Sequence, residues 1–72
     1  MKYIKIYIVC YVIEKSSCAI SKEYEDKFRV FIDGDSEQNL REANKFYNKI
    51  INKKKTYSAN ICQIIKSTDY DT

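Results

Sequence analysis

The alternation of apolar and polar residues divides the chain into four segments of regular structure. Side chains alternate with a period of two over residues 3–14 and 24–32, as they do in strands with a buried face. Residues 36–52 instead carry apolar side chains three and four positions apart, the spacing of one helix face. A last alternating segment covers residues 57–66. The pattern predicts an α+β domain of order β-β-α-β, with one amphipathic helix packed on one face of a three-stranded sheet.

The segment 36–52 carries helix signals at its start. Ser36 or Asp35 is the expected N-cap, and Gln38 follows Asp35 by three residues, as in a capping box. Gly34 is expected to supply the backbone freedom for the turn before the helix. The apolar stripe consists of Leu40, Ala43, Tyr47, Ile50 and Ile51, with Phe46 beside it. We expect this stripe to face the sheet.

The first strand is apolar on both of its faces. The face with even numbers is aliphatic and consists of Ile4, Ile6, Ile8, Cys10 and Val12. We expect that face to meet the helix. The other face carries a tyrosine at every fourth position, Tyr3, Tyr7 and Tyr11, with Lys5 between the first two. Because one helix covers only one face of a sheet, we expect the tyrosine face to stay uncovered.

The first strand is the most apolar segment, so it is expected at the centre of the sheet. The second strand is predicted antiparallel to it, and the third strand is placed on its other side, which gives the order 2-1-3. The inward side of the third strand stays open at this point. Ala59, Ile61 and Ile65 share one parity and Cys62 and Ile64 the other, a switch that a bulge would explain.

The composition excludes several classes of chemistry. The chain has 72 residues, three cysteines and no histidine, and no two cysteines form a Cys-x-x-Cys pair. Neither a disulfide framework nor a zinc site is therefore expected. Cys10 and Cys62 lie in apolar patterns and are expected to be small buried hydrophobes, whereas Cys18 is expected in an exposed turn. With no phosphate-binding glycine loop and no serine–histidine pair, we expect no enzyme, no catalytic residue, no cofactor and no metal.

Length and charge limit the organisation and the location of the chain. We expect one domain over residues 1–72, with no second domain and no linker. Residues 6–13 form an apolar run that is too short to span a membrane. The 13 basic residues exceed the 10 acidic ones by only three, which is too little to indicate a nucleic-acid-binding protein by itself. Free cysteines are typical of a reducing compartment, and we expect a cytoplasmic protein.

The sheet face expected to stay uncovered is the candidate binding surface. Its residues are Tyr3, Lys5, Tyr7, Tyr11, Lys27, Arg29 and Phe31. The first interpretation is a protein interface, either between copies in a homo-oligomer or with a foreign protein, because tyrosine and arginine are enriched in interfaces. The second is a half-exposed strand without a partner. The third is a platform for single-stranded nucleic acid, on which bases stack. A structural subunit of a larger assembly would carry the same pattern.

One stretch also resembles a group of known proteins. Residues 28–37 read FRVFIDGDSE and run into a helix and then a strand. This arrangement resembles small accessory proteins of phages and mobile elements, in which a strand ends in a short acidic or serine turn before the helix. The resemblance implies a compact β-β-α-β domain with an accessory role. It further implies, as one concrete form, a non-enzymatic inhibitor that occupies the surface of a host defence protein.

Overall fold

The computed structural model describes residues 3–15 and 22–67 of the chain. It contains the strands β1 (Tyr3–Glu14), β2 (Tyr24–Phe31) and β3 (Thr56–Ser67), and the helix α1 (Ser36–Ile51). The predicted α+β class and the β-β-α-β order are confirmed, and every element end lies within one residue of its expected position. The predicted turn with Cys18 and the end of the polar tail lie outside the described residues.

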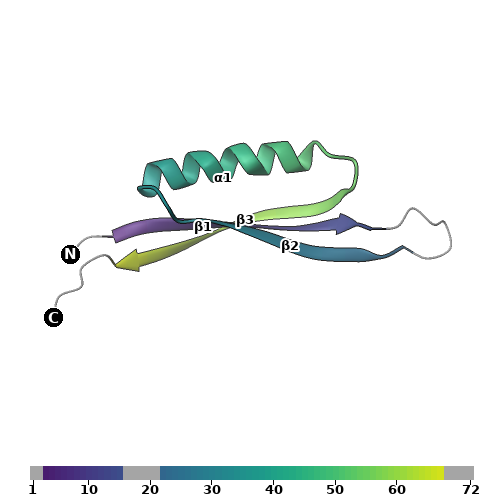
Figure 1. Ribbon diagram of the computed structural model, residues 1–72, viewed down its shortest axis with the longest axis horizontal. Helices are drawn as coiled ribbons and strands as arrows, with labels where there is room; N and C mark the ends of the chain where they lie inside the picture. Colours follow the sequence, from purple (N-terminus) through teal and green to yellow (C-terminus); the bar gives the residue numbers. More distant parts are fainter. Residues whose placement is uncertain (1–2, 16–21, 68–72) are drawn as a thin grey trace.

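The three strands form one sheet in the order β2-β1-β3, as predicted, with β1 in the centre. Both neighbours run antiparallel to β1, so β2 and β3 are parallel to each other. Figure 1 shows α1 lying along one side of this sheet. On the other side, the described chain provides no covering element. α1 is not of the length and apolarity that a membrane span requires.

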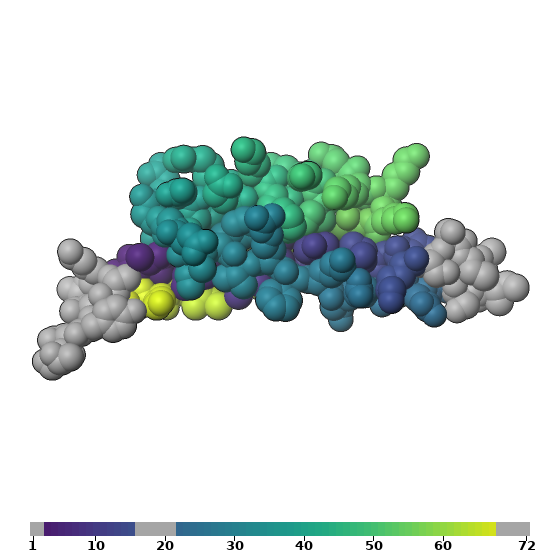
Figure 2. Space-filling view, in the orientation of Figure 1, coloured from purple at the N-terminus to yellow at the C-terminus, as the bar shows by residue number. Residues whose placement is uncertain are grey.

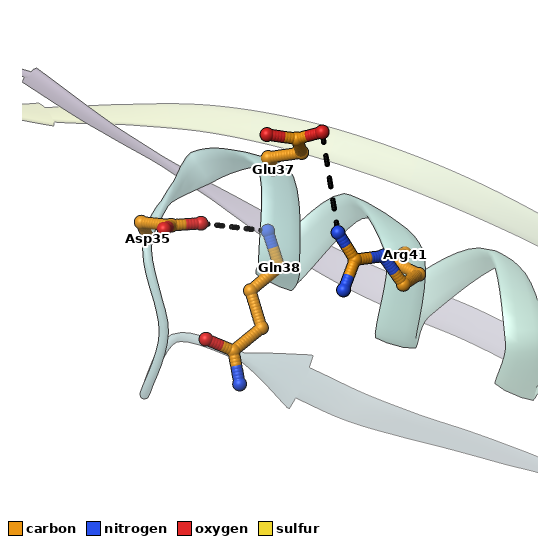
Figure 3. A network of polar contacts seen from close by, with 4 residues as sticks. All are labelled: Asp35, Glu37, Gln38 and Arg41. Atoms are coloured by element: carbon orange, nitrogen blue, oxygen red, sulfur yellow. Dashed lines mark hydrogen bonds and ion pairs between the residues drawn. The ribbon is translucent and has the colours of Figure 1, made fainter.

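The start of α1 is fixed by Asp35, which is the N-cap. Its backbone is extended, and its side chain accepts a hydrogen bond of 2.8 Å from the backbone N–H of Gln38 (Figure 3). The Gln38 side chain points away from Asp35 and lies over Gly34, so it does not complete a capping box. Gly34 has no positive φ, so the expectation that the turn needs glycine's backbone freedom is wrong.

Two side chains of α1 bind the backbone of β1 directly. The Lys5 N–H donates to Ser36 Oγ at 2.8 Å, and Asn39 Nδ2 donates to the Lys5 carbonyl oxygen at 3.0 Å. The pairing between β1 and β2 ends at Tyr7 and Phe31. The first turn of α1 therefore satisfies backbone groups of β1 that β2 does not reach.

The helix covers the tyrosine face of β1, so the prediction that it meets the aliphatic face is wrong. Val9 is 0% exposed and Tyr7 5%, and both form the core together with Ala43 and Ile50. The partly buried residues around this core are Tyr11, Phe31, Phe46, Tyr47, Ala59 and Ile61. Every member from the sheet has an odd number, and in β1 and β2 this is the parity that was expected to stay uncovered by the helix.

Aromatic size explains why this face is the buried one. A tyrosine ring buries a large apolar area while its hydroxyl reaches a polar partner, and Tyr7 Oη donates to Gln63 Oε1 at 3.2 Å. The small Ala43 lets α1 approach Val9, and the rings of Tyr11 and Phe46 meet edge to face at 5.8 Å. The rings therefore fill the space between helix and sheet, which the aliphatic residues were expected to fill.

The buried stripe of α1 is rotated from its expected position. Leu40 and Ile51 are exposed, whereas Asn39, which is not part of the predicted apolar stripe, is only 3% exposed. Its side chain contacts three backbone groups: it accepts from the Gly34 N–H and donates to the carbonyl oxygens of Gly34 and Lys5, each at 3.0 Å. A buried amide with these partners carries no unmet hydrogen bond.

The inward side of β3, which the sequence left open, is the side of Ala59 and Ile61. These residues pair with Tyr11 and Val9 and lie under the helix. A bulge is present, but at the start of the strand rather than at the parity switch. Val12 pairs with Ser58 and Ile13 with Thr56, so Tyr57 is the extra residue.

Candidate functional site: an open aliphatic sheet face

The side of the sheet opposite α1 is the candidate binding surface of the described chain. Its apolar residues come from all three strands: Ile4, Ile6, Ile8, Cys10 and Val12 of β1, Phe28 and Val30 of β2, and Cys62 and Ile64 of β3. We call this set the open face. Residues directly opposite each other in antiparallel strands share a face, so the register places all nine on one side.

The open face exposes large apolar side chains. Phe28 is 71% exposed, Ile64 48% and Val30 40%, whereas Ile6 is 7% exposed. In Figure 2 the lower surface of the molecule is formed by strand residues, with the helix confined to the upper side. A shallow hollow of about 520 Å³ lies beside Phe28, between Cys10 and Val12 of the central strand and Ser58 and Asn60 of β3. A contiguous apolar patch of this kind is typical of interaction surfaces.

A pair of tyrosines borders the open face at the hairpin end. The rings of Tyr24 and Tyr57 approach to 4.9 Å between centroids at an angle of 54°. They belong to the two outer strands, so the contact spans β1. The bulge at Tyr57 frees its side chain from the register and allows this contact.

Two thiols lie next to each other within the open face. Cys10 is opposite Asn60 and Cys62 is opposite Ile8, which makes the two cysteines diagonal neighbours. Partial desolvation raises the pKa of Cys10, and the charge of a Cys62 thiolate and a hydrogen bond between the two side chains add to this effect. Both are exposed, so the expectation that they are buried is wrong. A raised pKa keeps Cys10 protonated and weakly nucleophilic.

Charges of opposite sign mark the two ends of the open face. Glu14 and Asp26 share its parity at the hairpin end, opposite Tyr24 and Val12. Lys66 pairs with Ile4 at the other end. The apolar centre is therefore flanked by an acidic end and a basic end.

The residues predicted as the binding site lie on the helix side of the sheet. Tyr7 is in the core, Tyr11 and Phe31 pack against it, and Tyr3 and Lys5 are exposed near the end of β1. Lys27 is exposed, and its Nζ lies 3.7 Å from Glu25 Oε1 in an ion pair. The Arg29 guanidinium lies over the Phe31 and Phe46 rings, 5.2 and 4.9 Å from their centroids. The structure thus brings Arg29 and Phe31 together, but it does not present the tyrosines as a flat open surface.

In β1 and β2 the residues of the open face form the aliphatic parity, which the sequence pattern predicts to be the core; in β3 the pattern leaves the inward side open. The signal that could have separated the two faces is the aromatic content of the odd parity, since tyrosine packs well in a core that lets its hydroxyl reach a partner. Phe28 and Val30 on an edge strand follow the same even parity.

The described residues hold no group of three or more histidine, cysteine, aspartate or glutamate side chains that could bind a metal ion. Comparison with known proteins finds no matching family model, no matching curated protein and no matching solved structure. A proposal for the function of this chain therefore rests on the geometry of the open face.

Proposed function

We propose that the chain is a non-enzymatic protein-interaction module that acts through its open face, and that a second copy of the chain occupies that face. The single observation that carries this proposal is the aliphatic surface around Phe28, which no described element covers. Water contact with such a surface is unfavourable, and a partner that removes it from water gains free energy in proportion to the area.

The exposed side chains support a partner that covers all three strands. Phe28 and Val30 lie on β2 and Ile64 lies on β3, so exposed apolar groups flank the central strand on both sides. A partner layer that contacts the three strands removes these side chains from water together.

The charge pattern supports a second copy as that layer. In a two-fold arrangement whose axis crosses the strands, the acidic end with Glu14 and Asp26 lies over the end of the partner that carries Lys66. With the axis along the strands, Glu14 of one copy would instead face the same residue of the other. The first arrangement gives two sheets stacked about 10 Å apart, the ordinary spacing of a β-sandwich.

The first experiment is the solution mass by light scattering across a range of concentrations. We expect a dimer that dissociates when Phe28→Lys or Val30→Asp places a charge on the open face. Leu40→Lys is the matched control, because Leu40 is an exposed apolar residue of α1 on the other side of the sheet. That variant is expected to keep the dimer mass.

Thiol labelling gives a second readout of the same interface. In a Cys18→Ser background, Cys10 and Cys62 should react with a disulfide reagent more slowly as the protein concentration rises, because dimerisation covers them. A chain that stays monomeric at high concentration and labels at a constant rate would overturn the proposal. A dimer that survives Phe28→Lys would place the interface elsewhere.

The resemblance to phage and mobile-element proteins adds a more specific form of this proposal. In that form, the module inhibits a host defence protein by occupying its surface. We assign no described residue to a contact with a host protein, and inhibition of a defence protein stays a prediction.

A further inference from the structure

A second surface, on the helix side of the sheet, gathers basic residues that the proposed function does not use. Two hollows of about 240 and 180 Å³ adjoin there and share the side chain of Phe46. Six basic residues line them: Lys27, Lys53 and Lys55 in the larger, and Arg29, Lys45 and Lys49 in the smaller. We call these six residues the basic groove. Glu42 is the one acidic residue in either lining.

This concentration of charge is high for a chain with a net charge of only +3. The basic groove holds six of the 13 basic residues, and one of the 10 acidic ones, Glu42, lies in its lining. Within the described part of the chain, Lys27 is the only one of the six in an ion pair, a contact of 3.7 Å between Lys27 Nζ and Glu25 Oε1. Six positive charges near two carboxylates leave an excess of like charge, and a bound polyanion relieves the resulting repulsion.

Structural roles account for some of these residues but not for their convergence. Lys49 and Lys53 lie near the C-terminal end of α1, where a positive charge favours the helix dipole. Lys27 lies on the edge strand β2, where a lysine discourages pairing with other chains. Neither role requires the lysines of α1 to share a groove with Lys27 and Arg29 of β2.

From this geometry we infer that the basic groove binds the phosphodiester backbone of a nucleic acid. Lys45 and Lys49 are one helical turn apart, about 6 Å along α1. Lys27 and Arg29 are two residues apart on β2, about 6.8 Å along the strand. Two rows of charges with nearly equal spacing suit a chain of regularly spaced phosphates. Five of the six residues are lysines, which bind phosphate as point charges.

The same residues indicate that the basic groove does not recognise particular bases. The linings of the two hollows also hold three rings, those of Tyr11, Phe31 and Phe46. Tyr11 and Phe31 pack against Phe46, and the Arg29 guanidinium lies over the rings of Phe31 and Phe46, 5.2 and 4.9 Å from their centroids. No row of free rings is available there for successive bases. The binding is therefore expected to be insensitive to base sequence, which distinguishes it from the base-stacking platform considered from the sequence.

The test measures the affinity of the full chain for a fluorescent oligodeoxythymidine by anisotropy at several salt concentrations. With all six charges engaged, the plot of log affinity against log salt has a slope of about −4 for a single strand. Lys45→Gln or Lys49→Gln should reduce the size of that slope by about 0.7 and weaken binding to every sequence alike. Lys66→Gln, on the open face, is the matched control and should leave the slope unchanged.

Three results would overturn the inference. The first is no binding to the oligonucleotide at low salt, and the second is a slope that Lys45→Gln and Lys49→Gln together leave unchanged. The third is tighter binding of polyglutamate than of the oligonucleotide at the same ionic strength, which would identify an acidic protein surface as the ligand. None of these results depends on whether the open face forms a dimer, because Phe28→Lys can be tested in parallel.

Discussion

The side chain of Asn39 holds the carbonyl oxygen of Lys5 at 3.0 Å, and this bond fastens the first turn of the helix to the central strand. The same amide also bonds the N–H and the carbonyl oxygen of Gly34. One buried polar residue thereby sets where the helix begins relative to both β1 and the turn after β2.

Asn39→Ala should be among the most destabilising substitutions in the helix. It leaves three backbone groups without their side-chain partner in a region where Asn39 is 3% exposed. We expect a loss of about 2–4 kcal/mol in the free energy of unfolding, measured by urea titration with circular dichroism. Asn44→Ala, an exposed change on the same helix, should cost less than ~0.5 kcal/mol. Equal losses for the two variants would contradict the role assigned to Asn39.

Asp35→Ala should weaken the helix start. The substitution removes the acceptor for the Gln38 N–H, an interaction of 2.8 Å at the N-cap, and caps of this kind contribute about 1 kcal/mol. Asp35→Asn should retain most of that stability because its side-chain oxygen can still accept. Glu37→Ala breaks a largely exposed ion pair with Arg41 at 3.9 Å, so it serves as the control with a loss below ~0.5 kcal/mol. Thermal unfolding followed by circular dichroism measures the stability of these three variants and ranks them.

Gly34→Ala should stabilise the chain once Gln38 is replaced by alanine. The backbone of Gly34 has no positive φ, so alanine can adopt it. A Cβ there would stand 2.6 Å from Gln38 Oε1, an atom at the end of a flexible side chain. In a Gln38→Ala background, Gly34→Ala is therefore expected to stabilise the chain by about 0.4–1 kcal/mol through the unfolded state. A loss of stability in that background would show that the turn does need glycine.

The sequence predicts the elements of this fold well because each of them is a local property. Alternation from Tyr3 onward and the three-to-four spacing after Ser36 depend only on near neighbours, and they place every element end to within one residue. Strand order followed from the apolar character of β1. These features do not depend on which side of the sheet the helix takes.

The buried face could not be predicted in the same way, because β1 is apolar on both sides. Shifting the inward parity by one residue exchanges every side chain of the core, and the choice between Val9 and Ile8 depends on long-range packing. Ala43 and Val9 belong to one core cluster, although they lie more than thirty positions apart in the chain. Because the buried face of the sheet is not the expected one, the candidate binding surface is the face with Phe28 and not the face with Tyr7.

The two faces can be separated by the same substitution at two valines. Val9 is 0% exposed under the helix, and Val30 is 40% exposed on the open face. In dilute protein, Val9→Ala should lower the free energy of unfolding by about 2–3 kcal/mol because it leaves a cavity. Val30→Ala should cost less than ~1 kcal/mol, since solvent fills the space. The reverse order of the two losses would place the core on the aliphatic face.

Cys10 should react with an alkylating reagent only at high pH. Its pKa is raised above the ordinary value of 9.0 by desolvation, by the charge of Cys62 and by their hydrogen bond. In a Cys18→Ser background, the midpoint of its rate profile should lie above pH 9.0, and Cys62→Ala should lower it without restoring the ordinary value. The unfolded chain ionises first as the pH rises through 9.0, so the free energy of unfolding should fall there. Cys10→Ala should lack this fall, and a midpoint below 9.0 would contradict the assigned surroundings of the thiol.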